Sequence, residues 1–167
     1  MNVILCGMMG SGKTTVGKSV ALVTGKQWLD TDDIIVSRHG KISEIFSTHG
    51  EEYFRGLEKA LVEELSIQDG LVISTGGGLV LQPVNVENLQ KTGKIVFLRA
   101  KVSTLVDRLQ GDMTRPLLKG GELKEKIERL LTVREPLYEK AANYVVDVDD
   151  KTVEQIADEI VCLIEKE

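Results

Sequence analysis

The segment 7–14 constrains this chain more than any other, because it reads Gly-Met-Met-Gly-Ser-Gly-Lys-Thr. Two spaced glycines followed by lysine and threonine match the P-loop pattern. The flanks also fit, since residues 3–6 are an apolar run typical of a strand and residues 15–24 have helical character. A strand, a glycine turn and a helix start can wrap backbone N–H groups around a phosphate. The segment therefore predicts a nucleoside triphosphate site.

Within this segment, Lys13 and Thr14 carry the expected chemistry. The lysine would reach the β- and γ-phosphates, and the threonine hydroxyl would bind Mg²⁺. The glycines would let the main chain approach the phosphates closely. The alternative is a chance glycine-rich turn between a strand and a helix, which the agreement of both pattern and context disfavours.

Size and composition indicate one domain, 1–167, that is long enough to bury a full core. No apolar run approaches the ~18 residues needed to span a bilayer. The net charge of −5 disfavours a nucleic-acid binder. The first apolar run begins almost at Met1, which leaves no room for a targeting peptide, so we expect a cytoplasmic protein. Without an obvious exposed apolar patch, we expect a monomer. Cys6 and Cys162 are expected to be free thiols.

Strand-like and helical patterns alternate along the chain, which predicts a parallel sheet between two layers of helices. The fold class is therefore α/β, in three layers, with a five-stranded parallel sheet flanked by helices. The expected strands are 3–6, 28–30, 71–74, 95–98 and 144–148. The expected helices are 14–24, 32–38, 43–47, 51–65, 84–91, 104–109, 123–133 and 152–165.

Polar or glycine-rich segments follow the strands, where ligands bind in such sheets. Asp30 and Asp32 are two residues apart, so in an extended segment both carboxylates would point the same way. One could lie near Mg²⁺ and the other at a substrate hydroxyl, or this segment could simply cap the next helix. Residues 75–78 read Thr-Gly-Gly-Gly, which would leave backbone N–H groups open to a ligand.

Three arginines stand out in this acidic chain. Arg55 lies three residues before Glu58, so it could form a surface ion pair or lie in an aromatic-lined pocket. Arg115 lies in the glycine-flanked segment 110–122, which predicts a mobile lid. Arg134 precedes Pro136, which predicts a helix break and an arginine placed to grip a carboxylate, or else a charge at a helix C-terminus.

Taken in order, these segments resemble shikimate kinases, a family of the nucleoside-monophosphate-kinase-like P-loop group. The resemblance runs over essentially the whole chain. It rests on six motifs, which are the P-loop, Asp30-Thr31-Asp32, Phe54-Arg55 with Glu58, Thr75-Gly76-Gly77-Gly78, 114–118 and 134–138.

The resemblance implies a role for each matching position. Catalysis would rest on Asp32 as base with Lys13 and Arg115. The main substrate-binding region would be about 32–60. The residues that bind shikimate would be Asp32, Arg55, Gly77, Gly78 and Arg134. ATP would be held by Gly10, Ser11, Gly12, Lys13, Thr14, Thr15, Arg108 and Arg115. Mg²⁺ would be bound by Thr14 and, through water, by Asp30. Arg108 would stack on adenine, near the loop 149–151.

The expected activity is the ATP-dependent phosphorylation of the 3-hydroxyl of shikimate. Two alternatives stay open. A gluconate-type kinase has the same fold and also takes a hydroxylated carboxylate, although the triple glycine and Phe54-Arg55 favour shikimate. A non-catalytic nucleotide-binding regulator would be expected to lack Lys13, Asp32 or Arg115, and all three are present.

Overall fold

A computed structural model describes residues 1–110 and 120–166, and its centre is one parallel sheet of five strands. The strands are β1 Asn2–Cys6, β2 Gln27–Asp30, β3 Leu71–Ser74, β4 Gly93–Arg99 and β5 Tyr144–Asp147. Their spatial order is β2-β3-β1-β4-β5, and every neighbouring pair is parallel. The predicted five-stranded parallel sheet is therefore confirmed, with β1 and the P-loop that follows it in the middle.

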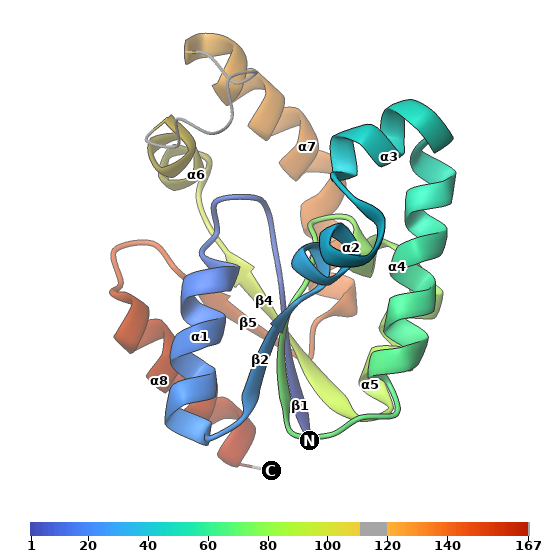
Figure 1. The fold of residues 1–167 in the computed structure, drawn as a ribbon. Coiled ribbons are helices and arrows are strands. Elements are labelled where there is room, and N and C mark those ends of the chain that lie inside the picture. The colour runs from blue at the N-terminus through green and yellow to red at the C-terminus, as the bar shows by residue number, and fades with distance from the viewer. Residues whose placement is uncertain (111–119, 167) are drawn as a thin grey trace.

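Helices cover both faces of the sheet (Figure 1). They are α1 Lys13–Thr24, α2 Thr31–His39, α3 Ile42–His49, α4 Glu51–Leu65, α5 Pro83–Gln90, α6 Val102–Gln110, α7 Gly120–Ala141 and α8 Val153–Glu165, with a 3-10 turn, η1, at Leu79–Leu81. Figure 1 shows α1 and α8 on one face and α4 and α5 on the other. The helices α3, α6 and the start of α7 rise beyond the carboxyl ends of the strands, where a ligand would lie.

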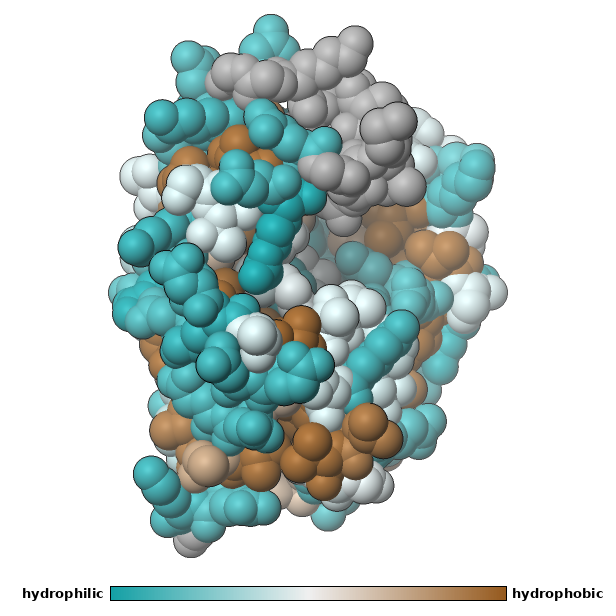
Figure 2. All heavy atoms as spheres, turned by 90° about the vertical axis from the view of Figure 1, so that its left-hand side faces the viewer, coloured by the Kyte–Doolittle hydropathy of each residue, from teal (hydrophilic) through white to brown (hydrophobic). Residues whose placement is uncertain are grey.

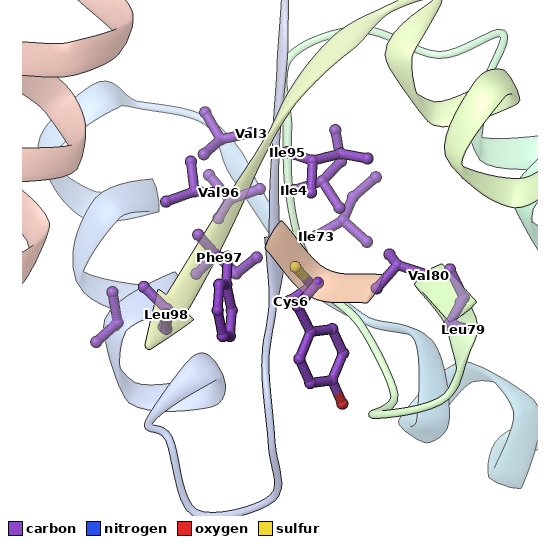
Figure 3. Close-up of a cluster of buried hydrophobic side chains, with 14 of the residues drawn as sticks. Val3, Ile4, Cys6, Ile73, Leu79, Val80, Ile95, Val96, Phe97 and Leu98 are labelled. Atoms are coloured by element: carbon purple, nitrogen blue, oxygen red, sulfur yellow. The ribbon is translucent and has the colours of Figure 1, made fainter. Parts of the chain in front are cut away.

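The core is built on the central strands. All five residues of β1 are buried, which is expected for a parallel strand that is covered on both faces. Figure 3 shows residues of β1 and β4 packed together with Leu79 and Val80 of η1. The apolar stripe of α8 closes one face with Ile156, Ala157, Ile160 and Ile164, all buried. The predicted cap is also present, since Thr152 and Gln155 form a reciprocal capping box at the start of α8.

The prediction of a helix break at Pro136 is wrong, because α7 continues through this proline to Ala141. A proline inside a helix removes one backbone hydrogen bond to the residue four positions earlier. Here Tyr138 and Ala141, which follow the proline, are buried in the core, and this packing keeps the segment helical. Arg134 therefore lies inside a helix rather than at a corner or a C-terminus. The centre of the predicted lid at 110–122, including Arg115, lies outside the described residues.

The surface on the side of α1 and α8 is largely hydrophilic, with hydrophobic groups gathered towards its lower end (Figure 2). Across the described ranges, no helix is long and apolar enough to cross a membrane. Both cysteines are free as predicted, with Cys6 buried in β1 and Cys162 exposed on α8. Burial raises the pKa of the Cys6 thiol to about 12, so this thiol stays protonated at neutral pH.

Candidate active site

A cleft of about 560 Å³ opens at the carboxyl ends of β1, β2 and β3. Its walls come from the P-loop, the start of α2, the middle of α4, the glycine turn after β3 and one residue of α7. The structure thus brings together most of the predicted site residues, namely Gly10, Gly12, Lys13, Thr14, Thr15, Asp30, Asp32, Arg55, Gly77, Gly78 and Arg134. Ser11 is buried just beside them.

The P-loop has the backbone that phosphate binding requires. Gly10 and Gly12 have φ angles of 83° and 95°, in the left-handed region that favours glycine. The α1 helix begins directly afterwards without a side-chain cap, so its first N–H groups and the positive end of its dipole are available to an anion. Lys13 Nζ donates to the carbonyl oxygens of Gly7 and Met8, at 2.5 and 3.2 Å, across the mouth of the loop.

The two aspartates reach the cleft from different elements. Asp30 ends β2 and caps α2, since its Oδ1 accepts from the backbone N–H of Asp33 at 3.1 Å. Asp32 lies in the first turn of α2, so the prediction that both project from one extended segment is wrong. A capping aspartate starts the helix one residue earlier than predicted. Burial, and then the charge of Asp30, raise the pKa of Asp32, while Lys13 lowers it.

The triple glycine makes room for three charged side chains. A Cβ atom on Gly76 would come within 2.6 Å of Asp32 Oδ1, and one on Gly77 within 3.1 Å of Arg134 Nη1. A Cβ atom on Gly78 would overlap the guanidinium of Arg55. Each glycine is therefore needed for the close approach of a different ionised group to the same turn. The Gly76 N–H also donates to Thr31 Oγ1 at 2.9 Å, which ties this turn to the start of α2.

Arg55 forms the expected ion pair with Glu58, but the pair lies at the cleft wall rather than on the surface. Its Nη1 donates to Glu58 Oε1 at 2.6 Å, and its Nη2 to Glu51 Oε1 at 3.3 Å, yet it also lines the cleft beside Phe54. The Glu58 side chain is buried, and burial raises the pKa of this carboxyl, while Arg55 lowers it. A surface pair would leave both partners in water, whereas this pair holds the guanidinium at the cleft wall.

We predict that Gly78→Ala raises the KM for a substrate that Arg55 would bind through an acid group by about 10- to 100-fold, the equivalent of the ~1.5–3 kcal/mol of a hydrogen bond to a charged group. The new methyl group would displace the Arg55 guanidinium and disturb its ion pair with the buried Glu58, so the melting temperature should fall as well. Gly56→Ala is the matched control, because nothing lies within 4 Å of a Cβ there. Steady-state kinetics check this prediction, and equal KM values for the two variants would contradict it.

Arg108 of α6 lies in a smaller hollow on the other side of the P-loop. Its Nη1 donates to the carbonyl of Gly10 at 3.1 Å, and the hollow is shared with Thr15, Val153 and Ile156. The exposed guanidinium and the apolar side chains of α8 offer two surfaces between which a flat ring could lie.

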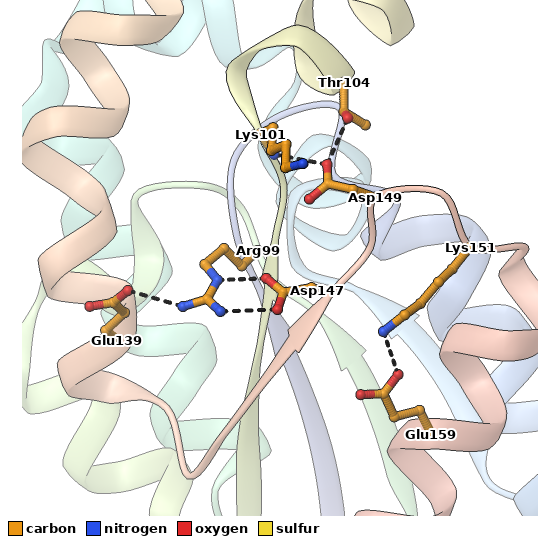
Figure 4. Close-up of polar contacts among 8 residues, drawn as sticks. All are labelled: Arg99, Lys101, Thr104, Glu139, Asp147, Asp149, Lys151 and Glu159. Atoms are coloured by element: carbon orange, nitrogen blue, oxygen red, sulfur yellow. Dashed lines mark hydrogen bonds and ion pairs between the residues drawn. The ribbon is translucent and has the colours of Figure 1, made fainter.

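The loop that follows β5, next to this hollow, is fixed by a polar network (Figure 4). Asp149 accepts from the backbone N–H of Lys101 at 2.9 Å and from Thr104 Oγ1 at 2.6 Å, which ties the loop to the start of α6. Arg99 donates twice to Asp147, at 2.6 and 3.0 Å. The loop 149–151 is thus held against the helix that carries Arg108.

Sequence reasoning missed the contributions of Thr31, Ser74 and Tyr138. Ser74 Oγ donates to the carbonyl of Lys13 at 2.7 Å, and accepts from Trp28 Nε1 at 3.0 Å. Tyr138 is buried and donates to the carbonyl of Gly77 at 2.6 Å. The only sequence signal for these residues was their place inside or beside the quoted motifs.

Fold and cleft together define the class of protein, a P-loop kinase of small molecules. The comparisons with known proteins give the family. A family model described as shikimate kinase matches residues 9–165. A shikimate kinase of Caldanaerobacter subterraneus subsp. tengcongensis is 44% identical over 161 residues, which are 96% of this chain and 94% of the relative. The chain belongs to the shikimate kinase family.

Solved structures agree with this assignment. A shikimate kinase from Acinetobacter baumannii, solved in complex with shikimate, has a TM-score of 0.90 and 37% identity, covering 99% of this chain and 93% of the other. A gluconokinase from Sinorhizobium meliloti has a TM-score of 0.61 and 18% identity, covering 99% of this chain and 91% of the other, so it shares the fold alone.

Proposed function

We propose that this chain transfers the γ-phosphoryl group of ATP to the 3-hydroxyl of shikimate, which gives shikimate 3-phosphate and ADP. One observation carries the proposal: Asp32, Arg55 and Arg134 converge on the triple glycine within the cleft that also holds the P-loop lysine. Two guanidinium groups can bind the carboxylate of an acceptor, and a carboxylate base can accept the proton of its hydroxyl. The family assignment supports the same reaction.

In the proposed reaction, Asp32 accepts the proton of the 3-hydroxyl as its oxygen attacks the γ-phosphorus. The new O–P bond forms as the bond to the leaving oxygen of ADP breaks, so the phosphoryl group moves from one oxygen to another. A pKa raised by burial makes Asp32 a stronger base than an ordinary aspartate, while the charge of Lys13 limits this rise. Arg55 and Arg134 would orient the acceptor through its carboxylate, and Gly77 and Gly78 would border its hydroxyls.

The nucleotide would be held by the P-loop and by Arg108. Backbone N–H groups from Gly10 to Thr15 would bind the phosphates, and Lys13 would exchange its carbonyl partners for phosphate oxygens. Arg108 would stack on adenine in the hollow beside α8. Arg115 stays a proposed phosphate ligand on the strength of the resemblance alone.

The residues present also fit Mg²⁺. Thr14 Oγ1 donates to Asp30 Oδ2 at 3.4 Å, so a hydroxyl and a carboxylate, both hard oxygen ligands, meet beside the P-loop. Within the described part of the chain there is no group of three acidic, histidine or cysteine side chains that could hold a metal. That suits an ion whose other ligands are phosphate oxygens and water. When bound, Mg²⁺ would offset the charge of the β- and γ-phosphates.

We predict that Thr14→Val raises the Mg²⁺ concentration needed for half-maximal activity, by at least the roughly 10–100-fold that loss of an outer-shell partner costs. Valine has the shape of threonine but lacks the hydroxyl. Thr14→Ser is the matched control and should keep a near-normal Mg²⁺ requirement. Titration of activity with Mg²⁺ at fixed free ATP checks this, and a normal requirement in the valine variant would remove Thr14 from the metal site.

The proposed function is tested by following ADP release from Mg·ATP with shikimate, with gluconate and with no acceptor. Fast release with shikimate alone supports the proposal. Release with gluconate instead would keep the P-loop interpretation and discard the acceptor. Binding of ATP without release would favour a non-catalytic regulator. The protein is further proposed to act as a cytoplasmic monomer, which sedimentation and fractionation would test.

A further inference from the structure

Tyr138 of α7 lies directly behind the cleft, at the meeting point of three parts of the site. Its side chain is fully buried, and its ring packs against Phe97 of β4 with 5.1 Å between the ring centroids. Its hydroxyl donates to the carbonyl oxygen of Gly77 at 2.6 Å and lies 4.0 Å from the sulfur of Met8 in the P-loop. Arg134 is one helical turn earlier on the same helix.

The hydroxyl of Tyr138 can serve two partners at once. It has one proton, which the short bond to Gly77 uses, and its lone pairs remain as acceptors. The Arg134 guanidinium, which carries N–H donors and a positive charge, lies on the same side of Gly77 as this hydroxyl. A Cβ atom built on Gly77 would lie 3.1 Å from Arg134 Nη1 and 3.6 Å from the Tyr138 hydroxyl, so both groups touch the same side of this glycine.

The bond to Gly77 also orients a donor of the next residue. The carbonyl of Gly77 and the N–H of Gly78 belong to one planar trans peptide, in which they point in opposite directions. The Tyr138 hydroxyl donates to the carbonyl of Gly77, so the N–H of Gly78 points away from Tyr138. Three successive glycines have little conformational preference of their own, and a hydrogen bond from a buried side chain supplies the missing constraint.

We propose that Tyr138 is a positioning residue for the acceptor: its hydroxyl fixes the Gly77–Gly78 peptide and the Arg134 guanidinium in the orientation in which shikimate binds. This inference rests on the proposed function. The residue touches neither substrate, and it acts through the turn and the arginine that do.

Tyr138→Phe tests this, because it removes one oxygen atom and keeps the ring that packs on Phe97. We expect the KM for shikimate to rise by up to about tenfold, the upper end of the scale of one hydrogen bond between neutral groups. The KM for ATP should stay within about twofold, since the P-loop is held by its own backbone bonds. An unchanged KM for shikimate, with or without a lower melting temperature, overturns the proposal.

Two further variants separate positioning from packing. Phe97→Leu disturbs the ring contact but leaves the hydroxyl, so it should lower the melting temperature and leave the KM for shikimate near the wild-type value. In an Arg134→Ala background, Tyr138→Phe should raise this KM by a smaller factor than in the wild type. Full multiplication of the two single effects would overturn the part played by Arg134. If the wild-type protein does not phosphorylate shikimate, the proposed function itself fails. If the wild-type protein is active and Tyr138→Phe leaves its KM for shikimate unchanged, only the inference about Tyr138 fails.

Discussion

Replacing Asp32 by asparagine is expected to lower kcat by about 10²–10⁴-fold, the range that a positioned general base contributes. Asparagine has the same shape but cannot accept the proton of the acceptor hydroxyl. Its environment favours the role of a base, because burial and the nearby charge of Asp30 raise the pKa of Asp32. Single-turnover phosphoryl transfer checks the effect on chemistry, and the binding of an ATP analogue should remain close to normal.

Asp33→Asn is the matched control for this experiment. Asp33 is the next carboxylate on α2 and is exposed, and its backbone N–H rather than its side chain binds Asp30. We expect its kcat to stay near the wild-type value. Turnover at the wild-type rate in Asp32→Asn would refute the assignment of the base.

Lys13→Met is expected to lower kcat by about 10²–10³-fold, the cost of removing one donor from a site that stabilises developing charge. It should also weaken nucleotide binding, which separates it from Asp32→Asn. Methionine keeps the length of the side chain but loses the ammonium, which donates to the carbonyls of Gly7 and Met8. Rates with saturating Mg·ATP and the affinity for an ATP analogue are the two measurements.

Lys18→Met controls for the loss of a lysine from the same helix. Lys18 is exposed, and its ammonium lies 4.8 Å from the centre of the Trp28 ring, away from the loop. Its kcat should remain near normal. If Lys18→Met and Lys13→Met lost the same amount of activity, net charge rather than contact with phosphate would explain the effect.

Local patterns in the sequence predicted most of the elements correctly. The P-loop pattern identified the βα turn, and β3 and α4 have the predicted bounds. Errors arose where local rules compete with packing. Local rules predict a helix end at Pro136, but the burial of Tyr138 keeps α7 intact. The spacing of Asp30 and Asp32 favours an extended segment, but the cap formed by Asp30 starts α2 at Thr31.

The sequence by itself determined the family of this protein, because its motifs predicted the P-loop and, through their resemblance to shikimate kinases, the residues that we propose as the base, the phosphate-binding lysine and the arginines. Only the tertiary structure decided how these groups meet. Asp32, Arg55 and Arg134 come from α2, α4 and α7, and the strand order that places β3 between β2 and β1 brings all three against one glycine turn. No local pattern predicts that these three side chains lie together, because contacts between residues far apart in the sequence depend on how the helices and strands pack.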